Sequence, residues 1–246
     1  MASNKLRLIT SILQTSGGKD KVMRIISYGS LLLSGVARSS TNSKKLLTIS
    51  GLLSSCRTVL RLFDDLPMLA YSLSYGWGTQ EKSLWLRALG LLNNLCDQVF
   101  FPLEHIAWAA DNKLINTSSS RWWTLSLIAW ALSLAFNILR SLTLLVELMK
   151  RLRKHHIQME DPTREQSSQD SSSEKQPVSH LQTAAKTQVL EVIKNVADLC
   201  NAVHWLPSGF LWGGLFSNTT VGFFGTISSV LLLRNIILQM QTNVAV

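Results

Sequence analysis

Charge is scarce in this chain. Asp, Glu, Lys and Arg make up 16% of its 246 residues and apolar residues make up 46%, whereas ordinary soluble domains contain about 25% charged residues. A disordered chain would be rich in charge and poor in apolar residues. The deficit of charge therefore argues against disorder and is typical of a membrane protein.

Cysteine is rare as well. Cys56, Cys96 and Cys200 are far apart and odd in number, so they offer neither a disulfide framework nor a C-x-x-C metal motif. The first ten residues, MASNKLRLIT, contain no long apolar run and no small-residue cleavage site. We therefore expect no secretory signal peptide.

Catalytic motifs are missing from the sequence. It contains no nucleophile elbow, Walker loop, dinucleotide-binding fingerprint or HExxH. Asp97, Glu104 and His105 are the nearest approach to an acid–base or metal cluster, but one pair of carboxylates and one histidine do not make a site. We expect no enzyme, no cofactor and no metal.

Basic residues outnumber acidic ones, 24 to 15, which gives a formal net charge of +9. Most of the excess lies early, since residues 1–121 contain 14 Lys and Arg against 7 Asp and Glu. Basic helices with an apolar stripe bind anionic lipid headgroups beside a membrane span, so we expect phospholipid as the partner. We expect no nucleic acid, because no zinc-finger spacing or RNA-recognition signature is present.

The longest apolar segment is Arg121–Leu148. Its first part, Trp122–Leu139, has no ionisable side chain and extends ~27 Å as a helix, close to the ~30 Å hydrocarbon core of a bilayer. Arg121 and the two tryptophans that follow it suit the headgroup layer. The alternative is a central helix of a soluble all-α core, which rarely has such a collar and a basic exit. We predict a transmembrane helix over residues 121–148.

A second uncharged and glycine-rich segment covers residues 209–233. We predict a second transmembrane helix here, with Asn218 as a polar interruption. Small residues would let another helix approach closely, and the predicted helix-packing positions are Gly209, Gly213, Gly222 and Gly225.

An amphipathic helix is predicted ahead of these spans, with Asp20 as its cap. Its large apolar residues keep to one face for four turns, and the predicted membrane-inserting residues are Val22, Ile25, Ile26, Leu32, Leu33 and Val36. Lys21 and Arg24 lie outside this stripe. Two interpretations stay open and are compatible: a bundle helix whose stripe faces protein, and an in-plane helix whose stripe enters one leaflet.

These segments predict an all-α integral membrane protein with N-terminal amphipathic helices and two transmembrane helices. Residues 1–120 form the amphipathic helical region. Residues 149–180 contain a basic cluster and a disordered linker, 181–206 a further amphipathic helix, and 234–246 a short C-terminal tail.

Five stretches, in the same order along the chain, resemble a known protein family. They are CRTVLRLFDDLPML from Cys56, DQVFFPLEHIAWAAD from Asp97, SSRWWTLSLIAWALSL from Ser119, NVADLCNAVHWLPSG from Asn195 and GTISSVLLL from Gly225. The last would be weak alone. Together they cover most of the chain and resemble the peroxisomal biogenesis factor 11 family, specifically its gamma-type branch.

The resemblance implies a non-enzymatic, multi-pass protein of the peroxisomal membrane with both termini in the cytosol, which elongates the membrane and promotes peroxisome fission and proliferation. It implies association with itself and with other family members, and recruitment of a tail-anchored fission adaptor and a dynamin-like GTPase. Carried over by position, Lys21 and Arg24 lie at phosphates, and the residues that insert into the cytosolic leaflet are Val22, Ile25, Ile26, Leu32 and Leu33. Arg121 is predicted at headgroups from its place at the start of the first span.

Relatives are also proposed to be pores for small metabolites, and this is the alternative function. The polar residues of the second span motivate it, namely Asn218, Thr219, Thr220, Ser228 and Ser229.

The basic residues around the first span do not fit the family topology. Two precede it, whereas five follow it: Lys150, Arg151, Arg153, Lys154 and Arg164. The positive-inside rule would place the linker in the cytosol. That rule describes insertion by the translocon, however, and proteins of this family enter from the cytosol by dedicated peroxins. We therefore keep the family topology as the prediction.

Overall fold

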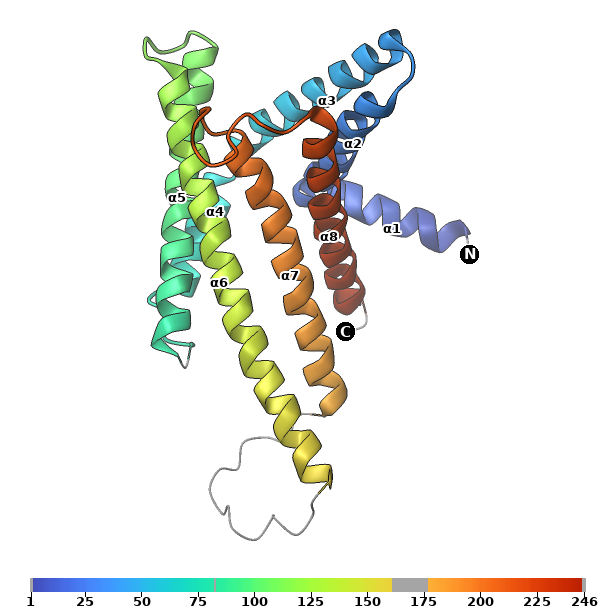
Figure 1. Ribbon diagram of the computed structural model, residues 1–246, viewed down its shortest axis with the longest axis vertical. Helices are drawn as coiled ribbons and strands as arrows, with labels where there is room; N and C mark the ends of the chain where they lie inside the picture. The colour runs from blue at the N-terminus through green and yellow to red at the C-terminus, as the bar shows by residue number, and fades with distance from the viewer. Residues whose placement is uncertain (1, 82, 161–176, 245–246) are drawn as a thin grey trace.

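The computed structural model describes residues 2–81, 83–160 and 177–244, and every regular element in this part of the chain is an α-helix (Figure 1). The helices are α1 (Ala2–Gln14), α2 (Ser16–Val36), α3 (Ser40–Arg61), α4 (Asp65–Tyr75), α5 (Leu84–Asp111), α6 (Ser119–Glu160), α7 (Val178–His204) and α8 (Asn218–Val244). The predicted all-α fold is confirmed.

Four long helices, α5 to α8, run up and down in turn and form the frame of the molecule (Figure 1). Each packs beside the next, and α6 is the longest at 42 residues. α2 packs on α8 and α3 packs on α2. The end of α3 returns to α5, where Arg61 Nε donates a hydrogen bond to Glu104 Oε2 at 2.8 Å.

α2 starts earlier than predicted. Thr15 is its N-cap, and the Thr15 hydroxyl accepts a hydrogen bond from the Gly18 N–H at 3.0 Å. A Thr side chain in this position satisfies one of the N–H groups that the first helical turn leaves free. Asp20 therefore lies inside the helix and is available for pairing.

Two helices are long and apolar enough to cross a membrane: α6 over Ser119–Ile157 and α8 over Asn218–Met240. α3 and α4 are bent by 55° at the break between them and would add a third span if they form one broken helix. The prediction of two such helices is confirmed. α6 continues to Glu160, so the first part of the predicted linker is helical; residues 161–176 lie outside the described residues.

The second span begins later than predicted, because α8 runs from Asn218 to Val244. Residues 209–217 form a loop, with positive φ at Gly209 (97°) and Gly214 (75°). The prediction that Gly209 and Gly213 pack helices together is wrong, because neither residue lies in a helix. The predicted tail is helical up to Val244, and residues 245–246 lie outside the described part of the chain.

We expect Gly213→Ala to disturb this loop. A Cβ at Gly213 would lie 2.6 Å from the Pro207 carbonyl oxygen and 2.8 Å from that of Leu206, and backbone atoms cannot yield as the end of a side chain can. Limited proteolysis in detergent should therefore cut the variant faster between α7 and α8. Gly51→Ala, where a Cβ meets nothing within 4 Å, is the control. Unchanged cleavage of the Gly213 variant would contradict the expectation.

Candidate membrane-facing surface and buried ion-pair network

α2 turns several polar side chains toward the bundle and part of its apolar stripe outward. Ser27 is buried, and its hydroxyl donates to the Ser50 carbonyl of α3 at 3.0 Å. Three stripe residues are instead well exposed: Ile26 by 47%, Leu33 by 54% and Val36 by 63%. This arrangement is the reverse of a helix on a water-soluble protein, and it is the one that lipid requires.

The other stripe residues have different surroundings. Val22, Ile25 and Leu32 are half-buried, and Leu32 lies against α8. The predicted membrane-inserting set is therefore divided between an outward edge and a protein contact.

Arg24 does not lie at the surface, where a headgroup contact would need it. It is only 8% exposed, and it forms an ion pair with Asp198 of α7. Its Nη2 also donates to the Ser228 hydroxyl of α8 at 2.9 Å, and the guanidinium lies 5.4 Å from the centroid of the Tyr28 ring. The prediction of Arg24 as a headgroup residue is wrong, because it shares the inward face of α2 with Ser27 and Tyr28.

The other two predicted headgroup residues have different positions. Lys21 is half-buried, and its Nζ lies 2.7 Å from Asp20 Oδ2. Arg121 is exposed at the start of α6, next to Trp122 and Trp123. Of the three, Arg121 is the one that the structure leaves most open to phosphate.

Several buried and half-buried ionised groups join the helices at the centre of the bundle. We call this set the ion-pair network; its members are Asp20, Lys21, Arg24, Arg57, Arg61, Glu104 and Asp198. It links α2 to α3, α3 to α5 and α2 to α7. Removing one partner of a buried pair typically costs ~3–5 kcal/mol, because the other charge stays buried alone.

Two of these pairs show how the network is built. Arg57 Nε donates to Asp20 Oδ1 at 2.8 Å. Glu104 is 2% exposed and accepts two hydrogen bonds from Arg61, a bidentate arrangement that is the strongest available to a carboxylate. Each charge is compensated close by, as burial away from water requires.

A cavity of about 620 Å³ lies beside the network. Its walls combine the charged groups with aromatic rings, including Phe100, Phe101, Trp123, Trp130 and Trp205. Trp130 and Trp205 stack with centroids 5.9 Å apart. The cavity is therefore amphipathic, with ion-paired side chains and aromatic rings in its walls.

Asp97, Glu104 and His105, considered above as an acid–base cluster, each interact with a different residue and do not form one site. Asp97 accepts from Asn93 at 3.0 Å, Glu104 pairs with Arg61, and His105 Nδ1 lies 3.1 Å from Asp65 Oδ2. Among the residues that the structure describes, no group of three or more His, Cys, Asp or Glu side chains could hold a metal ion.

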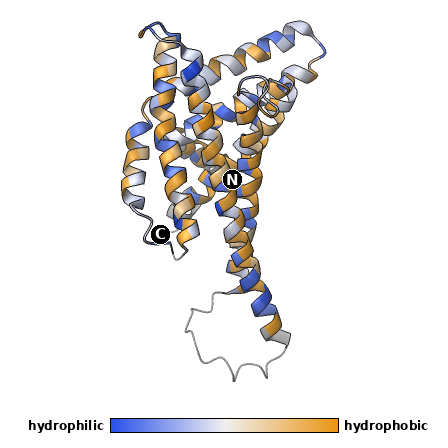
Figure 2. Ribbon diagram, turned by 60° about the vertical axis from the view of Figure 1, so that its left-hand side comes forward, coloured by the Kyte–Doolittle hydropathy of each residue, from blue (hydrophilic) through white to orange (hydrophobic). Residues whose placement is uncertain are grey.

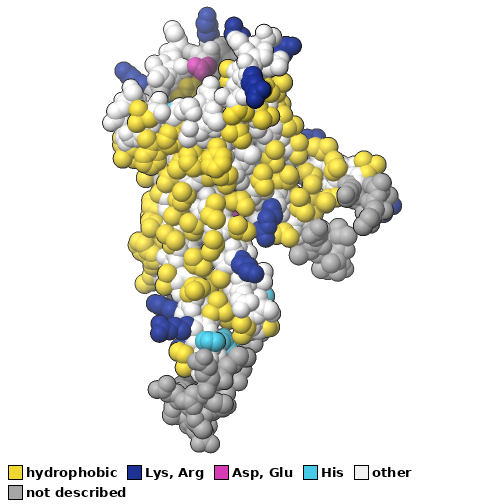
Figure 3. Space-filling model, turned by 45° about the vertical axis from the view of Figure 1, so that its right-hand side comes forward, with side chains coloured by type: hydrophobic (Ala, Val, Ile, Leu, Met, Phe, Trp, Pro, Cys, Tyr) yellow, Lys and Arg dark blue, Asp and Glu magenta, His cyan; other side chains and the backbone are white. Residues whose placement is uncertain are grey.

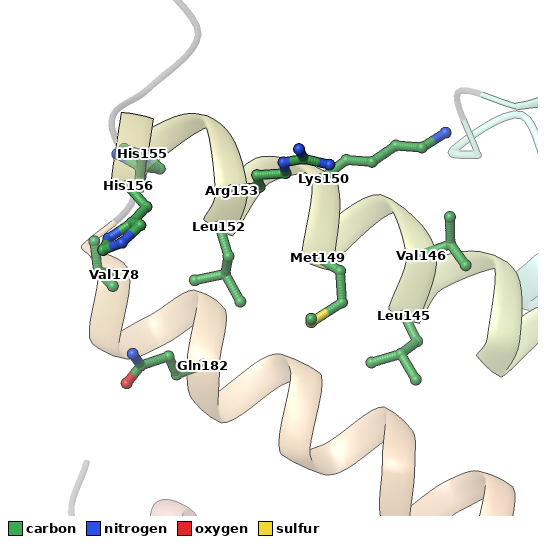
Figure 4. Close-up of a pocket in the computed structure, with 10 residues that line it drawn as sticks. All are labelled: Leu145, Val146, Met149, Lys150, Leu152, Arg153, His155, His156, Val178 and Gln182. Carbon is green, nitrogen blue, oxygen red and sulfur yellow. The ribbon is translucent and has the colours of Figure 1, made fainter. Parts of the chain in front are cut away.

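A larger cavity of about 800 Å³ lies at the far end of the molecule, between the end of α6 and the start of α7 (Figure 4). Leu145, Met149 and Leu152 point toward α7, whereas Lys150 points away from it. The groove is thus apolar inside with a basic rim. The basic residues of its rim are part of the basic cluster that follows the first span.

The outer surface of the bundle is mainly apolar. Figure 3 shows a broad hydrophobic face with Lys and Arg side chains gathered above it, and with others beside it from mid-height down to the lower end. In Figure 2 the long helices are largely orange, and blue returns where α6 approaches its end. Such an apolar face with basic groups toward both ends is compatible with a bilayer, in which cations meet the headgroups of each leaflet, although Arg234 is exposed within the candidate span of α8.

Two glycines allow α2 and α8 to touch. A Cβ at Gly222 would lie 2.3 Å from the Leu32 backbone nitrogen, and one at Gly225 would lie 2.2 Å from the Tyr28 ring. Contacts between small residues and a facing helix hold helices together in lipid, where no hydrophobic effect drives them. Gly222 and Gly225 thus lie at the closest approach of the two helices.

Which residues pair with one another in the ion-pair network was not predicted from the sequence. Arg57 and Arg61 stand four residues apart on one helical face, and Asp198 is an isolated carboxylate in an apolar stretch. An ionisable residue inside an apolar helix indicates an inward-facing group with a partner. That signal could have identified Asp198 and Glu104 as buried, but not whom they pair with.

Comparison with known proteins agrees with the geometry. The family model described as peroxisomal biogenesis factor 11 (PEX11) matches residues 6–237. The human protein named peroxisomal membrane protein 11C is 42% identical over 229 residues, covering 91% of this chain and 90% of that protein. The mouse protein of the same name is 39% identical over 231 residues, covering 92% of each.

No solved structure matches the chain. The family match covers nearly every helix described above, from α1 to α8, and both relatives align over almost their whole length. The chain therefore belongs to the peroxisomal biogenesis factor 11 family, whose members are peroxisomal membrane proteins of organelle biogenesis.

Proposed function

We propose that this protein remodels and elongates the peroxisomal membrane and so promotes fission and proliferation of the organelle, without catalysing a reaction. The observation that carries the proposal is the outward apolar edge of α2, formed by Ile26, Leu33 and Val36. Large apolar side chains exposed beside membrane-spanning helices displace acyl chains, since lipid is the solvent that accepts them.

The shape of the bundle supports this mechanism. α2 and α3 flank the upper part of the four long helices, whereas only α6 and α7 extend to the lower end (Figure 1). A protein that is wider at one depth takes up more area in one leaflet than in the other. Unequal leaflet areas bend a membrane.

Ile26→Glu should abolish remodelling and leave the fold intact. Ile26 is 47% exposed, so the change opens no cavity, but an ionised carboxylate is very costly to place in hydrocarbon. The full-length variant, reconstituted into liposomes with anionic lipid, should keep its helical circular dichroism and produce no tubules by electron microscopy. Ile26→Val is the matched control and should tubulate like the parent protein.

Two outcomes would count against the proposal. Tubules formed equally by Ile26→Glu would show that this edge is not the remodelling element. Loss of helical signal would instead show that Ile26 packs against protein. In cells, the same variant should reach peroxisomes, because both spans are unchanged, and fail to elongate them.

The proposal includes partners and a topology. The partners are anionic phospholipid, other copies of this chain and of its family, a tail-anchored fission adaptor and a dynamin-like GTPase. The topology is multi-pass, with both termini in the cytosol. These statements rest on what the resemblance to the family implies, and co-precipitation of the adaptor with the full chain is the first test of the partners.

The alternative function, a metabolite pore, has less support. The hydroxyls of Ser228 and Ser229 are fully buried and donate to the Gly225 carbonyl of their own helix. Thr220 pairs with Ser217 at the start of α8. These polar groups are satisfied locally and do not line the cavity beside the ion-pair network.

A further inference from the structure

α5 resembles a membrane-spanning helix from outside, although its composition is mixed. Between Leu84 and Ala110 it exposes no ionisable side chain: the exposed residues are Leu84, Trp85, Ala88, Leu92, Leu95, Val99 and Pro102. Its polar groups face the bundle. Asn93 accepts from Asn137 of α6 at 2.7 Å, and Glu104 is held by Arg61.

The later part of α7 has the same character. From Thr187 to His204 its exposed residues are Thr187, Val189, Ile193 and Val196. Its ionisable groups have partners on the inner side: Glu191 accepts from Asn235 of α8 at 2.7 Å, Lys194 pairs with Glu191, and Asp198 pairs with Arg24.

Both helices lie beside the apolar segments of the two spans. Next to α6, Asp111 at the end of α5 accepts from Trp123 at 2.7 Å, and Glu81, just before α5, pairs with Arg140. α5 therefore flanks α6 along the whole segment Trp122–Leu139, which has no ionisable group.

α7 lies between the two spans in the same way. Its Asn201 Nδ2 donates to the Val221 carbonyl of α8 at 3.1 Å, while Glu191 reaches Asn235 further along. On the α6 side, Trp205 at the end of α7 stacks on Trp130. Where the spans are in hydrocarbon, α7 is at the same depth.

Length permits both helices to cross. α5 has 28 residues, which is ~42 Å of helix, and the part of α7 from Thr187 to His204 extends ~27 Å, close to the ~30 Å that a bilayer core requires. Their average hydropathy is reduced by inward polar groups and, in α7, by the exposed Lys186 near its start, so an average over the whole helix conceals the apolar outward face of α5 and of the later part of α7.

We propose that α5 and α7 cross the bilayer together with α6 and α8, as a four-helix span with acyl chains on the outer faces of α5 and α7. In water, those faces would form an extensive exposed apolar surface, which soluble regions rarely have. The inference goes beyond the proposed function, since it holds whether or not the protein bends membranes.

The four-helix span reverses the position of the linker. With two spans, the end of α6 and the C-terminus lie on opposite sides; with four, they share one side. The exposed basic cluster from Lys150 to Lys154 then lies with the C-terminus. If that side is the cytosol, the positive-inside rule is obeyed, and the conflict between charge and family topology disappears.

Cysteine accessibility in intact peroxisomes tests this. Single cysteines are placed in the full-length chain after Cys56, Cys96 and Cys200 are changed to Ser, and a membrane-impermeant maleimide is added with and without detergent. The positions, all exposed outside the four helices or at their ends, are Gln80, Asn116, Ser179 and Ser208, with Gln239 as the reporter of the C-terminal side.

The four-helix span predicts that Gln80, Ser179 and Gln239 react on one side and that Asn116 and Ser208 react on the other. Gln80 and Asn116 on one side would show that α5 does not cross. Ser179 and Ser208 on one side would show that α7 does not cross. Either result overturns the inference.

Reactivity in detergent establishes that each cysteine can be labelled. Exposed neighbours serve as a second set where a substitution lowers expression: Thr79, Thr117, His180 and Pro207. The unlabelled chain without cysteine is the blank. Tubulation of liposomes by the same cysteine-free chain is measured separately, so a failure of topology and a failure of remodelling are distinguished.

Discussion

Asp198→Ala should lower the free energy of unfolding by ~3–5 kcal/mol, because it leaves the Arg24 guanidinium buried without its carboxylate. The remaining hydrogen-bond partner of Arg24 is the Ser228 hydroxyl, a neutral group, and Arg24 Nε already has no hydrogen-bond partner. A cation at 8% exposure cannot recover its hydration without opening the contact between α2, α7 and α8. Unfolding by sodium dodecyl sulfate in mixed micelles, followed by circular dichroism, measures the loss.

The double variant Arg24→Met with Asp198→Leu is the matched control. It removes both charges and keeps similar volumes, and such replacements are often neutral or stabilising. We expect it to recover most of the stability that Asp198→Ala loses. Equal losses in the single and double variants would contradict this account, since they would show that shape, and not charge pairing, matters at the position.

Gly222→Ala should separate α2 from α8. The added Cβ would lie 2.3 Å from the Leu32 nitrogen and 2.7 Å from its Cα, both backbone atoms that cannot rotate away. Overpacking of this kind typically costs ~1–3 kcal/mol or more, and here it acts on a whole helix pair. A disulfide trap between Gly35→Cys and Thr219→Cys, where a Cβ at Gly35 would lie 3.0 Å from the Thr219 Cβ, should form more readily in the parent chain than in the variant.

Gly29→Ala is the control for this second experiment. Gly29 lies in the same helix, but a Cβ there meets nothing within 4 Å, so the substitution should leave trapping unchanged and favour the helix slightly. Trapping that is equally efficient in both variants would show that α2 is not held against α8 at Gly222.

Local patterns in the sequence were sufficient for part of the fold. A run without ionisable groups, such as Trp122–Leu139, is enough to predict a membrane-spanning helix. The helical spacing of the apolar residues in α2 is enough to predict which residues share one face of that helix. Both could be read from a few consecutive turns. The start of α8 could not be predicted in this way, because residues 209–217 are as apolar as a span and hydropathy does not distinguish a loop from a helix. Pro207 and Gly214 were better indicators that this segment is a loop.

The position of Arg24 illustrates what a local pattern leaves open. On a helix at the membrane surface, the polar face meets water and headgroups. In a membrane bundle, the polar face meets protein, and the apolar face meets lipid. The two cases have the same sequence signature. Arg24 and Asp198 are 174 positions apart, so only the fold, by bringing α2 against α7, decides between them.

The central claim is that the outward edge of α2 lies in hydrocarbon, and spin-label accessibility tests it most directly. Nitroxides are attached singly at Ile26, Leu33 and Val36 of the full-length protein in liposomes, with buried Ser34 as the reference within the same helix. Collision with oxygen, which concentrates in lipid, is compared with collision with a water-soluble nickel chelate. The account predicts high oxygen and low nickel collision at the three edge positions, and low values of both at Ser34. High nickel collision at Ile26 and Leu33 would place the edge in water and contradict it.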